Sequence, residues 1–333
     1  MITSVRFRNF KALRDTTLPL GRFTLIVGPN GSGKSTVLQA LLALRSSVVQ
    51  GDDFPKYATA GLSPEKDGPV QVTVLWDGVL AGFTTTAEWP ATPGSWRKVE
   101  HRPEIQDASC TNLTAVRVYS LDASAIAAPV LLRPRIELEP NGAGLAGVLD
   151  RLRDSHPERF EALNVELARW IPEFDRILFE TPAEGNRTIS LRKHAGGHPI
   201  HARDLSQGTL LALALLTLAY LPDPPAIMGL EEPDRGIHPR LLREVRDALY
   251  RLSYPEKFGE KRDSVQVVAT THSPSFLDLF REHPEEIVIA NKVGGEVRFE
   301  RLAERDDITE ILEDTPLGDA WYSGILGGVP ANT

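Results

Sequence analysis

The chain has 333 residues, and 37 Lys and Arg stand against 45 Asp and Glu, so its formal net charge is −8 at neutral pH. Hydrophobic residues make up 41% and charged residues 25% of the sequence, which excludes a disordered or fibrous protein. A chain with net negative charge has no overall electrostatic attraction for nucleic acid. The single cysteine, Cys110, excludes an internal disulfide and is typical of a reducing compartment.

Hydropathy gives no sign of a membrane segment. The best candidate, residues 210–221, is shorter than a membrane helix and contains Thr217 and Tyr220. Residues 1–8 alternate like a strand and lack the apolar centre of a signal peptide. The sequence therefore predicts a cytoplasmic protein without a membrane partner.

The first elements are typical of a nucleotide-binding α/β unit. Residues 4–8 alternate like a strand, and residues 23–27 are nearly all apolar, as in a central strand covered on both faces. A glycine-rich turn and an apolar helical stretch at 36–44 follow. Residues 1–50 also carry seven Lys and Arg against one Asp, whereas residues 301–333 carry two Arg against seven acids.

The middle of the chain has a different pattern. Alternation over 70–76 and 79–86, around Asp77-Gly78, predicts a β-hairpin, and 115–121 is a further expected strand. Helical spacing covers 144–170, and a second hairpin is expected around Glu184-Gly185-Asn186. The remaining elements return to an α/β pattern: helix 210–221, strand 226–230, helix 239–252, strand 265–270, helix 274–280, and strands 287–291 and 297–302.

The glycine-rich turn matches the phosphate-binding pattern G-x-x-x-x-G-K-[ST] between a strand and a helix. Its residues are Gly28, Pro29, Asn30, Gly31, Ser32, Gly33, Lys34 and Ser35, followed by Thr36. Backbone N–H groups of such a loop surround phosphate oxygens, and the helix start adds partial positive charge. We expect Lys34 to reach the β- and γ-phosphates and the Ser35 hydroxyl to bind Mg²⁺.

Two carboxylates, Glu231 and Glu232, end the apolar strand at 226–230. Neighbouring side chains of a strand point to opposite faces, so the two acids should have different roles. Glu231 would serve the metal and its water shell, and Glu232 would orient or deprotonate the attacking water. The alternative is an exposed acidic turn after an edge strand.

Two further motifs complete the set. Leu205-Ser206-Gln207-Gly208-Thr209 begins a long apolar helix, where Ser206 is suited to cap the helix and free N–H groups bind anions. His272 follows the strand at 265–270, at the sheet edge where ligands bind in such folds, and could bond the γ-phosphate. Plain helix capping and a structural histidine are the alternative interpretations.

In chain order, these motifs resemble those of ABC-type ATPases, specifically the soluble heads related to the SMC, RecF and OLD (overcoming lysogenization defect) proteins. The matching residues lie at 8–11, 28–36, 205–209, 231–239 and 271–274, and residues 317–330 resemble the tail of a group of bacterial predicted AAA-family ATPases. Residues 34–206 lack heptads and few residues follow His272, so we expect a head without a coiled coil or nuclease domain.

The resemblance implies one α/β, ABC-type P-loop NTPase head over residues 1–333, with a mixed central sheet, an antiparallel β lobe and a helical insert. We expect a P-loop unit at 1–50, the β lobe at 51–140, a helical and hairpin insert at 141–200, and a lobe at 201–333 that carries the signature, the two acids and His272.

The resemblance also implies that two heads clasp ATP and Mg²⁺ between them. Ser206 and Gly208 of one subunit would then contact the γ-phosphate held by Lys34 of the other. Glu232, His272 and Lys34 form the expected catalytic set, and Ser35 and Glu231 the metal ligands. Glu231 stands where most relatives carry Asp, and the signature reads LSQGT where transport ATPases read LSGGQ.

The expected activity is Mg²⁺-dependent ATP hydrolysis coupled to dimerisation, in the service of DNA repair or anti-phage defence. DNA would meet the N-terminal basic residues Arg6, Arg8, Lys11 and Arg14. The alternative is a slow ATP switch that holds or releases an effector protein encoded nearby. The cluster of His194, His198 and His201 is interpreted as a polar hairpin loop, with a zinc site as the alternative.

Overall fold

The computed structural model describes residues 1–50, 69–77, 84–89, 97–102, 112–293 and 296–327. The chain forms two compact units. The first comprises Met1–Val118, Pro225–Glu232 and Ser253–Thr333, and the second comprises Tyr119–Pro224 and Pro233–Leu252. Cys110 and Gly78, the second residue of the turn predicted at Asp77-Gly78, lie outside the described residues.

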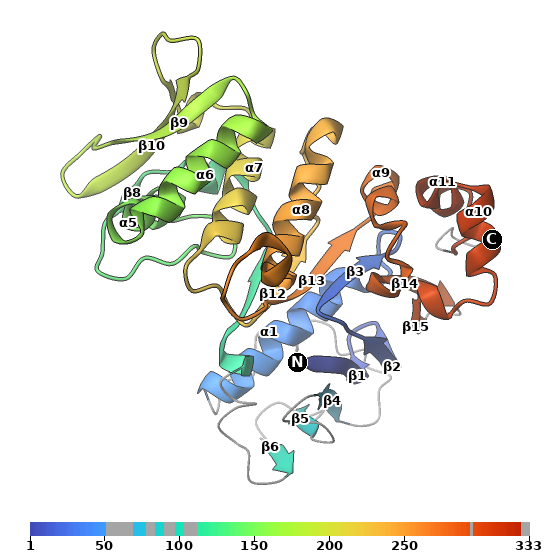
Figure 1. The fold of residues 1–333 in the computed structure, drawn as a ribbon. Helices are drawn as coiled ribbons and strands as arrows, with labels where there is room; N and C mark the ends of the chain where they lie inside the picture. The colour runs from blue at the N-terminus through green and yellow to red at the C-terminus, as the bar shows by residue number, and fades with distance from the viewer. Residues whose placement is uncertain (51–68, 78–83, 90–96, 103–111, 294–295, 328–333) are drawn as a thin grey trace. The chain divides into compact units, whose positions relative to one another are not determined.

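The central sheet of the first unit has six strands in the order β15-β14-β3-β13-β12-β7 (Figure 1). They are β15 (Glu296–Arg301), β14 (Ile287–Val293), β3 (Phe23–Val27), β13 (Gln266–Thr271), β12 (Ile227–Glu231) and β7 (Val116–Tyr119). Strands β14, β3, β13 and β12 run parallel, and β15 is antiparallel to β14. Every residue of β3 and β13 is buried, and burial on both faces explains why β3 is almost wholly apolar.

Helix α1 (Lys34–Gln50) packs on this sheet. A glycine in β12 allows the close approach: a Cβ on Gly229 would lie 2.9 Å from a methyl of Val118 and 3.0 Å from one of Leu38. The strand predicted at 226–230 is present as β12, shifted by one residue towards the C-terminus. The helix predicted at 36–44 is present as α1, which begins two residues earlier and ends later than predicted.

A five-stranded antiparallel sheet in the same unit has the order β2-β1-β4-β5-β6 (Figure 1). Its strands are β1 (Ile2–Phe10), β2 (Leu13–Pro19), β4 (Val70–Trp76), β5 (Thr84–Trp89) and β6 (Arg97–Arg102). The sequence did not predict β2, because Arg14, Asp15 and two threonines interrupt its apolar pattern. Of the strand expected at 79–86, residues 84–86 lie in β5, and the earlier residues lie outside the described part of the chain.

The second unit is mainly helical. Its helices are α4 (Ala123–Ala127), α5 (Leu145–Ser155), α6 (Pro157–Trp170), α7 (Gln207–Tyr220) and most of α8 (Leu242–Ser253). Its strands are β8 (Val130–Leu131), β9 (Phe174–Glu180), β10 (Asn186–Lys193) and β11 (Ile200–His201). The helical region expected at 144–170 is two helices, because Pro157 starts a new one after His156. The hairpin predicted around Gly185 is confirmed as β9 and β10.

Three short helices follow β13 and β14 in the first unit: α9 (Pro274–Leu277), α10 (Ile308–Asp314) and α11 (Leu317–Tyr322). The helix expected at 274–280 is α9 followed by a 3-10 turn at Asp278–Phe280. Helix α11 packs on α9, where the Gly318 N–H donates to Asp278 Oδ1 at 2.7 Å. The predicted mixed central sheet, antiparallel sheet and helical segment are thus all present. Among the described residues, every helix is too short or too polar to cross a membrane.

Candidate nucleotide-binding site

The glycine-rich loop connects the end of β3 to the start of α1. Gly31 and Gly33 have φ of +79° and +90°, a region that glycine enters without steric cost. A Cβ on Gly33 would also come within 3.1 Å of Leu13 and 3.3 Å of Val297. The helix starts directly afterwards, since the Val37 N–H donates to the Gly33 carbonyl at 3.1 Å. The loop residues Asn30, Gly31 and Ser35 are exposed, and Pro29 and Thr36 are half-buried.

Gly28 closes the loop against the neighbouring strand. A Cβ there would lie 2.4 Å from Ser32 Oγ and 2.7 Å from the Ala290 carbonyl in the middle of β14. The Ser32 N–H donates back to the Pro29 carbonyl at 3.2 Å. Ser32 Oγ itself is buried and has no hydrogen-bond partner among the described residues. A buried hydroxyl without a partner is costly, and its position in the loop fits an anionic ligand.

Lys34 lies inside the loop, with 6% of its surface exposed. Its ammonium donates to the carbonyls of Gly28 at 2.6 Å and Pro29 at 3.0 Å. Burial lowers the pKa of Lys34, and the nearby carboxylates of Glu232 and Glu231 oppose that shift. The structure therefore brings the loop lysine and both predicted acids into one electrostatic neighbourhood.

The Ser35 hydroxyl donates to Glu231 Oε1 in a short hydrogen bond. Glu231 ends β12, whereas Ser35 lies in the first turn of α1, so strand and helix deliver two oxygen donors to one point. Hydroxyl and carboxylate oxygens are the ligands that Mg²⁺ prefers. The residues present therefore fit the predicted metal site, with glutamate in the place of the usual aspartate.

Glu232 and His272 form a pair at the carboxyl ends of β12 and β13. Glu232 Oε1 lies 2.7 Å from His272 Nδ1, and the two side chains are 21% and 50% exposed. The Glu232 N–H donates to the Thr270 carbonyl at 3.1 Å and to Thr270 Oγ1 at 3.2 Å. Since β12 and β13 are parallel neighbours with Glu231 opposite Thr270, the sheet register itself produces this pair. Thr270 has no signal in the sequence, because a threonine in a buried strand belongs to no motif.

The signature residues lie in the second unit. Ser206 is the N-cap of α7: its Oγ accepts from the Thr209 N–H at 3.2 Å and lies 2.8 Å from Thr209 Oγ1. Gly208 is needed for packing, since a Cβ there would lie 2.9 Å from the Gly236 carbonyl. The capping expected at Ser206 is therefore observed, whereas its contact with a phosphate of another subunit stays a prediction.

Three of the four N-terminal basic residues, Arg6, Arg8 and Lys11, have polar partners in the structure. Arg6 makes two-pronged hydrogen bonds to Asp15, and Arg8 lies 3.9 Å from the same carboxylate. The Lys11 ammonium donates to Gln39 Oε1 at 2.5 Å, and burial lowers the pKa of Lys11. Asp15 therefore partly neutralises Arg6 and Arg8, which lowers the positive charge of the surface where DNA binding is expected. In the histidine cluster, His201 Nδ1 lies 3.0 Å from Glu180 Oε2, as in an ordinary polar hairpin.

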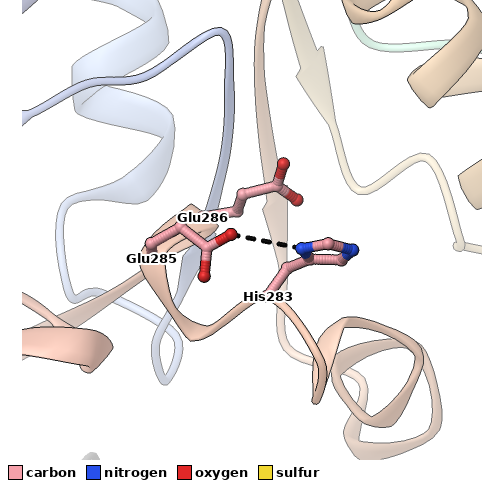
Figure 2. A group of neighbouring side chains, drawn as sticks. All are labelled: His283, Glu285 and Glu286. Atoms are coloured by element: carbon pink, nitrogen blue, oxygen red, sulfur yellow. Dashed lines mark hydrogen bonds and ion pairs between the residues drawn. The ribbon is translucent and has the colours of Figure 1, made fainter. Parts of the chain in front are cut away.

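A second group of titratable side chains lies before β14, at His283, Glu285 and Glu286 (Figure 2). His283 Nδ1 lies 3.1 Å from Glu285 Oε1, the contact drawn in Figure 2. Glu286 is buried and accepts from the Tyr254 hydroxyl at 2.5 Å. These hydrogen bonds indicate that the group has a structural role at the start of β14.

Two ATPase families match the sequence. The family described as "AAA domain, putative AbiEii toxin, Type IV TA system" matches residues 113–278, and the "AAA ATPase domain" family matches residues 1–66. The fold is that of the ABC-type P-loop ATPase heads. The SMC head solved in complex with the C-winged helix domain of ScpA aligns with a TM-score of 0.64 at 16% identity, covering 93% of this chain and 99% of that one. The SMC head of Thermotoga maritima aligns with a TM-score of 0.50 at 16% identity, over 90% and 98%.

Curated relatives match over shorter stretches. The OLD nuclease of Thermus scotoductus is 46% identical over 55 residues, 16% of this chain and 10% of that protein. The zinc transport system ATP-binding protein TroB of Treponema pallidum is 35% identical over 104 residues, 28% of this chain and 38% of that protein. The chain thus spans well under half the length of these relatives. The predicted resemblance to ATPase heads of the SMC and OLD class is confirmed, and the resemblance to RecF stays a prediction.

Proposed function

We propose that this chain hydrolyses ATP with Mg²⁺, and that two copies close around the nucleotide to do so. The observation that carries the proposal is the convergence of Lys34, Ser35, Glu231, Glu232 and His272 at one edge of the central sheet. Phosphoryl transfer to water needs positioning and neutralisation of charge more than covalent chemistry. Each of these side chains supplies one of those two requirements.

The position of each of these residues gives it a separate role in ATP hydrolysis. Lys34 exchanges its loop carbonyls for β- and γ-phosphate oxygens, which are stronger acceptors. Ser35 and Glu231 would hold Mg²⁺, which supplies neutralisation of phosphate charge. Glu232 accepts a proton from the attacking water. His272, bonded to Glu232 in this structure, fixes the direction of that carboxylate and donates toward the γ-phosphate.

The acid assignment is tested with Glu232→Gln, which keeps the side-chain size and removes the base. We expect phosphate release to fall about 100-fold or more, the typical lower range for general acid–base catalysis, while ATP affinity stays within about two-fold. Light scattering with ATP and Mg²⁺ should then detect a stable dimer. Unchanged turnover of Glu232→Gln would refute the assignment.

The closure of two copies is tested at the signature. Ser206→Arg places a long cation at the start of α7 and should prevent ATP-dependent dimerisation while leaving nucleotide binding intact. Ser155→Arg, at an exposed serine at the end of α5, is the matched control and should dimerise normally. Loss of ATP binding in Ser206→Arg would place the signature in the subunit's own site instead.

The work that ATP drives is proposed to be linked to DNA, because part of the chain matches the OLD nuclease. The test is phosphate release with and without duplex DNA at about 50 and 200 mM salt. Stimulation that decreases steeply with salt is expected, since contacts with phosphates release counterions.

A second candidate follows from the family that matches residues 113–278, whose description names a toxin of a type IV TA system. In that case the ATP cycle holds or releases a partner protein, and DNA leaves turnover unchanged. Turnover that is independent of DNA, together with nucleotide-dependent capture of a protein encoded by a neighbouring gene, would favour this candidate.

A further inference from the structure

The backbone of Glu232 is strained. Its φ is +45°, and it is one of three non-glycine residues with positive φ in the described part of the chain. Of the other two, Asn9 lies near the end of β1 and Lys11 lies in the turn between β1 and β2. Left-handed backbone is sterically unfavourable for an L-residue, and it persists only where the surroundings hold it in place. At Glu232, a neighbouring residue must therefore hold the backbone in this conformation.

Thr270 is the neighbour that contacts the strained peptide. The Glu232 N–H is shared between the Thr270 carbonyl and Thr270 Oγ1, at 3.1 and 3.2 Å. The carbonyl contact continues the parallel ladder, in which Glu231 faces Thr270, and any residue at 270 would supply it. The hydroxyl contact is specific to this side chain, which is 1% exposed and held by its strand.

The same turn sets the direction of the carboxylate. Directly after Glu231, the chain leaves the strand at Glu232, and the Glu232 side chain then reaches His272 Nδ1 at 2.7 Å. Thr270 and His272 both come from β13 or its end, so one segment holds the backbone and the carboxylate of Glu232. A shift of the Glu232 peptide would move its carboxylate relative to Lys34 and Ser35, and misplacement by about 1 Å can cost about 100-fold in rate.

We propose that Thr270 is a positioning residue, whose hydroxyl holds Glu232 in its left-handed conformation and so directs the water-activating carboxylate. The inference rests on the proposed function, in which Glu232 is the base. It goes beyond that function because it assigns a role to a residue that no motif includes and that does not touch the reacting atoms.

The test compares Thr270→Val with Thr270→Ser and Thr24→Val. Valine keeps the branched shape and removes the hydroxyl, and serine restores the hydroxyl. Thr24 is the matched control: it is a fully buried threonine in β3, and its Oγ1 accepts a backbone N–H, that of Gly21, at 3.0 Å. Both valine variants therefore lose one buried hydrogen bond of the same kind. The bond of Thr24 lies at the amino ends of the parallel strands, and that of Thr270 lies at their carboxyl ends.

We expect kcat of Thr270→Val to fall about 10-fold, with the Kd for ATP within about two-fold of the parent protein. Thr270→Ser should recover kcat to within about three-fold, and Thr24→Val should keep the parent kcat. Melting temperatures of the two valine variants should fall by similar amounts. An equal kcat in Thr270→Val and Thr24→Val would overturn the positioning role, whatever their melting temperatures.

Glu232→Gln separates failure of this inference from failure of the proposed function. If Glu232→Gln abolishes turnover and Thr270→Val does not lower it, only the positioning role is wrong. If Glu232→Gln keeps turnover, the base assignment is wrong. Where both hold, adding Thr270→Val to Glu232→Gln should cause no further loss of kcat, since the carboxylate that Thr270 directs is already absent. A full additional 10-fold loss would mean that Thr270 acts elsewhere.

Discussion

Polar and charged groups are arranged differently at the two ends of the parallel strands. At the carboxyl ends, Glu232 has a strained backbone, Ser32 Oγ is buried and lacks a partner among the described residues, and Lys34 is buried with its charge. At the amino ends, by contrast, the polar atoms of the buried Gln266 side chain all have partners. The Gln266 side chain accepts from the Ile2 N–H at 2.9 Å and donates to the carbonyls of Ile2 at 2.6 Å and Gly21 at 2.8 Å.

The amino ends carry a second network around Tyr254. Its hydroxyl donates to the buried carboxylate of Glu286, and the Arg22 guanidinium lies 4.6 Å from its ring. Arg22 in turn makes two hydrogen bonds to Glu256, at 2.8 and 3.0 Å. The contrast teaches that this sheet is stabilised at one end and kept ready for a ligand at the other, where unfavourable local geometry is retained.

The largest difference should come from Gly28→Ala at the carboxyl ends. The new methyl group would lie 2.4 Å from Ser32 Oγ and 2.7 Å from the Ala290 carbonyl, so the loop has to move. Overpacking typically costs about 1–3 kcal/mol, which predicts a loss of ATP affinity of about 5- to 150-fold. Titration with a fluorescent ATP analogue measures it, and the melting temperature without nucleotide controls for folding. Unchanged affinity would mean that the loop adapts.

Gln266→Leu should be the largest change in stability at the amino ends. It removes three hydrogen bonds and leaves backbone groups of Ile2 and Gly21 without their partner. At about 1 kcal/mol each, the free energy of unfolding should decrease by about 3 kcal/mol, with ATP affinity preserved. Gln71→Leu, which loses one half-buried bond to Glu88, is the matched control and should cost under about 1 kcal/mol. Similar losses in urea denaturation would contradict the contrast.

Tyr254→Phe tests the second network, with a smaller effect. Burial, followed by the hydrogen bond to Glu286, raises the pKa of Tyr254 well above its ordinary value. The folded state therefore favours the neutral phenol, so this stabilisation is intact below about pH 10 and is lost as the pH rises further. We expect Tyr254→Phe to cost about 1 kcal/mol at neutral pH and to weaken the decline of stability above pH 10. Equal alkaline declines in both proteins would argue against this network.

The smallest effect concerns the strain itself. Glu232→Gly and Glu232→Ala both remove the carboxylate, but only glycine adopts the observed φ without steric cost. We expect the glycine variant to be the more stable of the two by about 1 kcal/mol. Thermal unfolding of the pair measures this difference directly. A more stable alanine variant would show that the turn relaxes when the glutamate is removed.

The sequence predicted the carboxyl ends better than the amino ends. The phosphate loop, the two acids and His272 were found because their chemistry limits the residue types and their spacing. The central strands were found because burial on both faces makes them continuously apolar. The roles of Ser206 and Gly208 in a second subunit remain predictions of the motif.

Other features had no signal in the sequence. Strand β2 is built from Arg14, Asp15 and threonines, and pairing with β1 makes it a strand. Gln266, Tyr254 and Glu286 meet their partners only through the topology, and residue type alone does not show which buried polar groups are paired. The positive φ of Glu232 depends on a turn that follows a strand, and glutamate is not a residue that predicts one.

The position of β3 in the sheet has a consequence for synthesis. This strand pairs on one side with β13 and on the other with β14, so both of its neighbours lie more than 230 residues further along the chain. During translation at roughly 5–20 residues per second, the nascent strand waits on the order of tens of seconds with both edges unpaired. The glycine-rich loop at the end of β3 is therefore synthesised long before the two strands that pair with β3. Newly made chains therefore depend during that interval on whatever shields exposed strand edges in the cell.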